Sequence, residues 1–234
     1  MKKNILLILL FVTISKSFAQ SQLFTIVKDS AILRKENDLL IRDFEQRVKK
    51  VDSNISFKGL KTIVRDSLFA GYYLPRTNRI YLPRWETIPQ PIIDFCTKVS
   101  GSRKEGENLA AMYFYGFFLP HEIAHGLQYN TNILKDNEYD NEYQASEMAL
   151  LYWKARGKEK ELAACYAIAK KVLSNLKNPI PANADMKKYF TEHYEEMAQD
   201  ADQYGYMMFS QIVTIFEDKT LPDFDTYMKR FLAK

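Results

Sequence analysis

The chain contains only three histidines, and two of them stand four positions apart. His121 and His125 belong to the sequence HEIAH, in which Glu122 follows the first histidine directly. On a helix, positions i and i+4 share one face, so both imidazoles can reach a single zinc ion. Glu122 lies on the adjacent edge, where its carboxylate can take a proton from a water molecule on the metal. The spacing therefore predicts a hydrolytic zinc site.

The surroundings of the motif favour this interpretation over chance. Residues 110–119 form a strongly apolar run, which predicts a buried helix leading into the motif. Polar side chains in such a helix are costly without partners, and a metal would supply them. The alternative is a pair of core histidines hydrogen-bonded to their neighbours. Pro120 removes one helical hydrogen bond and favours a kink just before the ligands.

A catalytic zinc ion needs a third protein ligand and an open position, and the next predicted helix offers three glutamates. Glu142 shares its face with small residues that allow close approach to the motif helix. Glu147 points about 140° away from Glu142 by helical geometry. Glu138 shares the face of Glu142 but lies in a polar entry segment. We therefore favour Glu142, with a solvated surface glutamate as the alternative.

The sequence HEIAHGLQ, followed by NEYQASEMALLYW, resembles the gluzincin metallopeptidases. The resemblance implies a compact zincin-like domain in which His121, His125 and Glu142 hold zinc and Glu122 is the general base. Many members place Asp or Asn four residues after the glutamate ligand, to orient a ligand histidine. This chain has Ser146 there, whose hydroxyl can still form a hydrogen bond.

The resemblance also implies a small sheet before the motif helix, with an edge strand along the cleft. Residues 70–83 occupy the corresponding place in the sequence, and an exposed edge can bind an extended peptide by strand addition. An ordinary structural hairpin is the alternative for this segment.

Peptide hydrolysis also needs a hydrogen-bond donor for the oxyanion of the transition state. The C-terminal third offers His193, Tyr194, Tyr204 and Tyr206. We name His193 and the pair Tyr204 and Tyr206 as catalytic candidates. The alternative for each tyrosine is core packing with a polar tip.

The periodicity of the chain predicts an α+β fold that is mainly α. A long helix is expected over residues 22–51, and strands over 60–64, 68–73 and 79–83, with a turn at 74–78. Three prolines then break up the connection between 83 and 91. Helices are expected over residues 107–130, 138–156, 158–176, 186–198, 203–217 and 221–233.

The N-terminus has the layout of a secretory signal peptide, with a basic start, ten apolar residues and a cleavage region ending at Ala19. The apolar run is too short for a membrane anchor, so we expect an exported protein, periplasmic or secreted, with one domain over residues 20–234. Removing Lys2, Lys3 and Lys16 from the 33 basic residues leaves 30 against 29 acidic ones. This near-neutral balance gives no reason to expect a nucleic acid partner. Cys96 and Cys165 fit either a disulfide or two buried thiols.

The leading hypothesis is thus an exported zinc-dependent metallopeptidase acting on a peptide or protein substrate. The alternative is a zinc-stabilised, non-catalytic binding module with the same fold. A helical protein with a chance motif is a third hypothesis, and it predicts no bound metal. The sequence identifies neither the substrate nor the oligomeric state.

Overall fold

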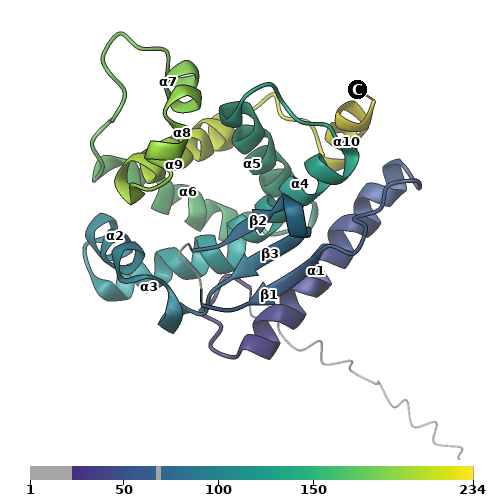
Figure 1. The fold of residues 1–234 in the computed structure, drawn as a ribbon, viewed down its shortest axis with the longest axis horizontal. Helices are drawn as coiled ribbons and strands as arrows, with labels where there is room; N and C mark the ends of the chain where they lie inside the picture. The colour runs from purple at the N-terminus through teal and green to yellow at the C-terminus, as the bar shows by residue number, and fades with distance from the viewer. Residues whose placement is uncertain (1–22, 67–69, 234) are drawn as a thin grey trace, which may run out of the picture.

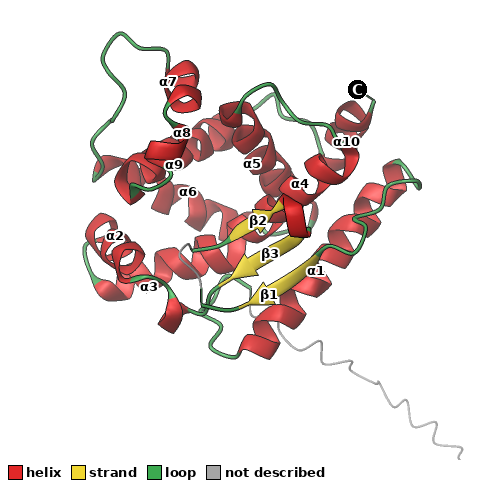
Figure 2. Cartoon of the chain, in the orientation of Figure 1, coloured by secondary structure: helices red, strands yellow, loops and turns green. Residues whose placement is uncertain are grey.

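The computed structural model describes residues 23–66 and 70–233, and the predicted signal peptide lies outside the described residues. Helices make up most of this part of the chain, around one small sheet (Figures 1 and 2). The α+β class with a helical majority is therefore confirmed. Among the described residues, no helix combines the length and the apolar content that a membrane crossing requires.

The sheet has three strands, β1 (Lys61–Val64), β2 (Tyr72–Leu74) and β3 (Arg79–Leu82), in the order β1-β3-β2. β2 and β3 form an antiparallel hairpin around the short 3-10 turn Pro75–Thr77, and β1 pairs with β3 in parallel. β2 pairs only with β3, so it forms an edge of the sheet. It also lies against the helix that carries the HEIAH motif.

The first helix, α1 (Ser30–Val51), begins later than predicted. Asp29 caps it, because its side chain accepts hydrogen bonds from the N–H groups of Ala31 and Ile32. Phe24, inside the predicted helix, has a φ of 64° instead. Its ring packs on Trp153 and over Gly116, where an added Cβ would lie 2.3 Å from the ring. Core packing thus decides the conformation of this segment.

The connection after the sheet also differs from the prediction, because it contains a helix. α2 (Gln90–Ser100) follows Pro89 directly and has Pro91 in its first turn. Proline is compatible with the first turn of a helix, where the missing N–H would have no helical partner. Gly101, at a φ of 90°, ends this helix. The prolines therefore mark its start and do not prevent it.

The motif helix is approached through a continuous helical run in three parts. α3 (Arg103–Met112) passes into a π-helical turn (Tyr113–Phe117) and then into α4 (Phe118–Thr131). The N–H of Phe118 bonds to the carbonyl of Tyr113, five residues back. The wider turn lies where Pro120 removes the hydrogen bond to Gly116, so the helix changes its type locally just before the motif, at the place where the sequence predicts a kink.

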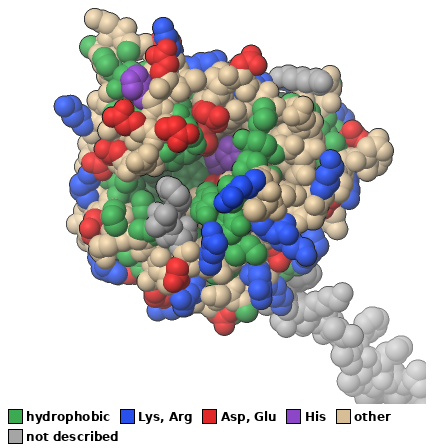
Figure 3. Space-filling model, in the orientation of Figure 1, with side chains coloured by type: hydrophobic (Ala, Val, Ile, Leu, Met, Phe, Trp, Pro, Cys, Tyr) green, Lys and Arg blue, Asp and Glu red, His purple; other side chains and the backbone are tan. Residues whose placement is uncertain are grey.

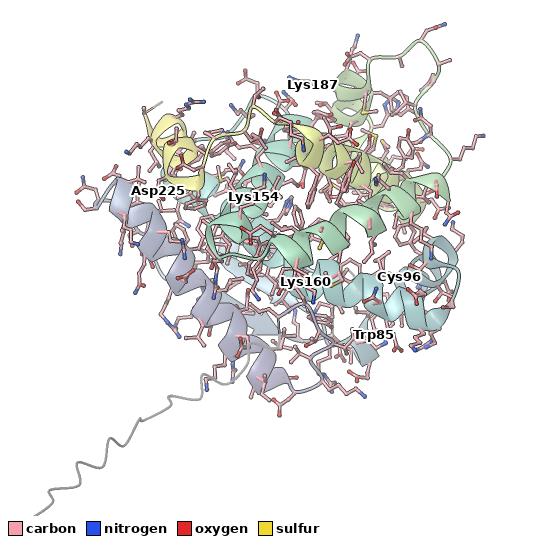
Figure 4. All side chains as sticks on the ribbon, turned by 180° about the vertical axis from the view of Figure 1, so that it is seen from behind. Trp85, Cys96, Lys154, Lys160, Lys187 and Asp225 are labelled. Atoms are coloured by element: carbon pink, nitrogen blue, oxygen red, sulfur yellow. The ribbon has the colours of Figure 1, made fainter. Side chains whose placement is uncertain are left out.

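The remaining helices follow the predicted order with shifted ends. They are α5 (Glu138–Ala155), α6 (Glu159–Ser174), α7 (Met186–Glu192), α8 (Tyr194–Met197), α9 (Ala201–Glu217) and α10 (Phe224–Leu232). The predicted helix over 186–198 is interrupted at His193. Seen from behind, α6 crosses the molecule from the labelled Lys160 toward α2, where Cys96 is labelled (Figure 4). Cys96 and Cys165 are both buried free thiols, which excludes the disulfide alternative in this structure.

Candidate metal centre

Three side chains from two packed helices converge on one point. His121 and His125 come from α4, and Glu142 comes from α5. The Nε2 atoms of the two histidines lie 3.1 Å apart, and Oε2 of Glu142 lies 3.1 Å from the first and 3.5 Å from the second. All three side chains are largely removed from solvent, with 3%, 13% and 8% exposure respectively. This cluster could bind a metal ion.

The ring orientation of His125 is fixed by Gln128, one turn further along α4. The Gln128 amide donates to the backbone carbonyl of Asn141 and to Oε1 of Gln144. Because the Asn141 carbonyl can only accept, the oxygen of Gln128 must face His125, whose Nδ1 lies 2.9 Å away. Nδ1 of His125 therefore carries the proton, and Nε2 faces the cluster.

The ring of His121 is held from α5. Its Nδ1 lies 3.0 Å from the hydroxyl of Ser146, which is fully buried. Ser146 is thus the hydrogen-bond partner of a candidate ligand, in the place where the resemblance implies Asp or Asn. Ala145 and Ala149, on the same helix, are also fully buried, in agreement with a small-residue surface for close packing.

The electrostatics of the cluster call for a positive charge at its centre. Burial lowers the pKa of His125, but Glu142, with smaller contributions from Glu122 and Gln128, outweighs it and raises this pKa to about 9. Burial raises the pKa of Glu142, yet His125 and His121 together hold it well below its usual range. Two ring nitrogens at 3.1 Å from each other repel unless a proton or a metal ion lies between them.

The donor set suits a divalent transition metal, and zinc is one that it fits. Zinc takes histidine nitrogens and carboxylate oxygens at about 2.0–2.2 Å in tetrahedral geometry, so its ligand atoms lie about 3.3–3.5 Å apart. The observed separations of 3.1, 3.1 and 3.5 Å are close to this spacing. Three protein ligands also leave a fourth position open, as in catalytic zinc sites.

Glu122 connects the motif helix to the sheet. Its Oε2 accepts a hydrogen bond of 2.7 Å from the backbone N–H of Tyr73, on the edge strand β2. Burial raises the pKa of Glu122, while the two histidines of the cluster act in the opposite direction. The edge strand therefore fixes the carboxylate beside the cluster of His121, His125 and Glu142.

A cavity of about 520 Å³ opens beside the cluster, and both His121 and Glu122 line it. Figure 3 shows the corresponding hollow, with a histidine inside, hydrophobic side chains at its sides and acidic side chains at its rim. Tyr194 of α8 and Tyr204 of α9 also line this cavity. Burial raises the pKa of both phenols, and the charge of Glu142 acts in the same direction, so both keep their protons at neutral pH.

The other two predicted catalytic residues, His193 and Tyr206, do not lie at the cavity. His193 stacks on Tyr189 and bonds to its carbonyl, and neither His193 nor Tyr206 lines the cavity. Tyr206 packs against a small separate core around Phe190. Of the alternative ligands, Glu147 accepts a hydrogen bond from Tyr227 on another face of α5, and Glu138 is not among the clustered groups.

Two parts of the site were missed by sequence reasoning. Gln128 had a usable signal, because it lies three positions after His125 and so on a neighbouring face of the same helix. The backbone N–H of Tyr73 had none, because only the packing of β2 against α4 brings it to Glu122.

Comparisons with protein-family models, with characterised proteins and with solved structures gave no match for this chain. The fold and the site by themselves define a mainly helical α+β protein with a buried His-His-Glu cluster suited to a metal ion.

Proposed function

We propose that this protein is an exported zinc-dependent metallopeptidase with a zincin-like active site. His121, His125 and Glu142 hold the zinc ion, and Glu122 is the general base. The observation that carries the proposal is the position of Glu122, whose carboxylate is fixed by Tyr73 beside three converging ligand atoms. Export is inferred from the sequence of residues 1–19 alone.

When bound, zinc supplies Lewis-acid polarisation of the scissile carbonyl and makes a water molecule more acidic. The carboxylate of Glu122 accepts a proton from the attacking water and delivers it to the nitrogen of the leaving amine. The N–H of Tyr73 holds the carboxylate in place during both steps.

Tyr194 is the donor that we assign to the oxyanion of the transition state. Tyr194 and Tyr204 line the cavity together, with ring centroids 6.4 Å apart, and a hydrogen bond couples their hydroxyls. In this arrangement Tyr204 positions Tyr194, and His193 and Tyr206 do not take part.

The test is a Glu122→Gln variant of the mature chain, residues 20–234, with zinc measured by mass spectrometry and cleavage measured on a peptide library. We expect one zinc per chain in both proteins and a loss of hydrolysis of about 10²–10⁴-fold, the usual contribution of a general acid–base. Glu192→Gln, an exposed site on α7, is the control and should retain activity.

Two results would contradict the proposal in different ways. Zinc-loaded wild type that cleaves no peptide in the library would favour the non-catalytic zinc-stabilised binding module. Wild type that takes up no zinc, even from excess metal, would support the third hypothesis, in which HEIAH is a chance motif in a packed helix.

A further inference from the structure

The cavity beside the metal cluster has an uneven distribution of polar groups. Its ionisable groups come from α4 (His121 and Glu122), from the tyrosine pair of α8 and α9, and from Tyr72 of β2, and Gln199 adds a polar amide. The rest of its wall is largely apolar, and its large side chains come mainly from α2, the π turn, α4 and α9. This part comprises Ile92, Phe95, Phe114, Phe118, Met208 and Phe209.

Among the described residues, Glu122 is the only carboxylate that lines the cavity, and no lysine or arginine does. A charged group that moved into the apolar part would lose its hydration and gain no partner there. The apolar wall therefore selects against a charged occupant. In Figure 3 hydrophobic side chains line much of the hollow, while the charged side chains on this face lie at its rim.

The walls are built from aromatic rings in close contact with other parts of the core. Phe114 and Phe118 are stacked, with centroids 6.3 Å apart and planes 19° apart. Phe95 lies against Gly205 of α9, where an added Cβ would be 2.6 Å from the ring. At about 520 Å³ the cavity falls within the usual range for small-ligand sites, with room for a large side chain beside a stretch of main chain.

We propose that this cavity selects the substrate: it binds a bulky, uncharged apolar side chain, aromatic above all, on a residue next to the scissile bond. The inference rests on the proposed peptidase function and names the substrate class of that site. The polar groups hold the peptide group, and the apolar wall takes the side chain.

The test uses three hydroxamates that differ only in the side chain: benzyl, carboxymethyl and aminobutyl. The hydroxamate group binds the metal without turnover, so binding to the zinc-loaded protein can be measured by calorimetry whether or not the protein cleaves peptides. We expect the benzyl compound to bind about 10–100-fold more tightly than the charged ones, because a buried large apolar side chain contributes that much. Equal binding of the three compounds would overturn the inference.

A matched pair of variants tests whether the apolar wall of the cavity causes the preference for the benzyl compound. Ile92 lines the cavity on α2, whereas Ile168 is equally half-buried on α6 and does not line it. We expect Ile92→Lys to bind the carboxymethyl compound more tightly than the benzyl one, and Ile168→Lys to keep the wild-type order. Thermal melting checks that each variant folds. If Ile92→Lys does not fold, Ile92→Ala replaces it, and we expect Ile92→Ala to bind the benzyl compound severalfold more weakly than wild type does. An unchanged order in Ile92→Lys, or unchanged benzyl binding in Ile92→Ala, would contradict the assignment.

Cleavage data separate this inference from the proposed function. Wild type that hydrolyses no peptide but prefers the benzyl hydroxamate would contradict the peptidase proposal and support the ligand class of the cavity. Wild type that cleaves mainly beside charged residues would support the peptidase proposal and overturn the inference about its substrate.

Discussion

The side-chain oxygen of Gln128 lies 2.9 Å from Nδ1 of His125, and the amide of Gln128 has only one orientation that satisfies its other partners. This contact sets which nitrogen of His125 faces His121 and Glu142. We expect Gln128→Leu to weaken zinc binding by about 10–100-fold, the usual effect of removing the partner of a ligand histidine. Competition with a fluorescent chelator measures the affinity. Asn130→Leu, on the same helix but away from the ligands, is the control, and an equal loss there would contradict a specific role for Gln128.

On the proposed function, removal of the metal should destabilise the protein, because zinc would bind the folded cluster and not the unfolded chain. At a zinc concentration about 1,000 times the dissociation constant, binding contributes about 4 kcal/mol to the free energy of unfolding. For a chain of this size, that corresponds to a Tm lower by about 10 °C after chelation, measured by differential scanning fluorimetry.

The same measurement identifies the ligands. His125→Ala and Glu142→Ala should show no change of Tm when zinc is added, because each lacks one of the three converging atoms. Glu147→Ala should keep the response, since Glu147 bonds to Tyr227 on another face of α5. If Glu142→Ala still responds to zinc and either Glu147→Ala or Glu138→Ala does not, the residue whose loss abolishes the response is the third ligand.

The hydroxyl of Tyr194 should matter to the rate and not to metal binding. We expect Tyr194→Phe to lower kcat by about 10²–10³-fold, the usual cost of one lost oxyanion donor, with KM and zinc content little changed. Tyr206→Phe removes the same group from a residue that does not line the cavity, and its kcat should match wild type. A lower kcat in Tyr206→Phe and an unchanged kcat in Tyr194→Phe would identify Tyr206 as the donor.

The two cysteines should be unreactive in the folded protein. Burial raises the pKa of both thiols to about 12, so neither forms a thiolate at pH 8. We expect DTNB to titrate no thiol in native protein and two in guanidinium. Because the unfolded thiols ionise near their ordinary pKa, the free energy of unfolding should fall as the pH rises above about 9. Two reactive thiols in native protein, or none after denaturation, would contradict this assignment.

The sequence by itself determined the features that depend on local spacing. The interval from His121 to His125 fixes two imidazoles on one helical face, and helical angles separate Glu142 from Glu147. The alternation of apolar and turn residues likewise predicted the hairpin of β2 and β3. These features follow from backbone geometry, which is the same in any helix or strand.

The tertiary structure decided everything that depends on contacts between distant segments. Phe24 leaves the predicted helix because its ring packs against Gly116 and Trp153, which are far away in sequence. Tyr194 reaches the cavity and Tyr206 does not, although both lie in the same tyrosine-rich stretch. The partner of Glu122 is a backbone N–H, which no residue type encodes. Such contacts depend on how helices and strands pack against each other, and a single sequence records that packing only indirectly.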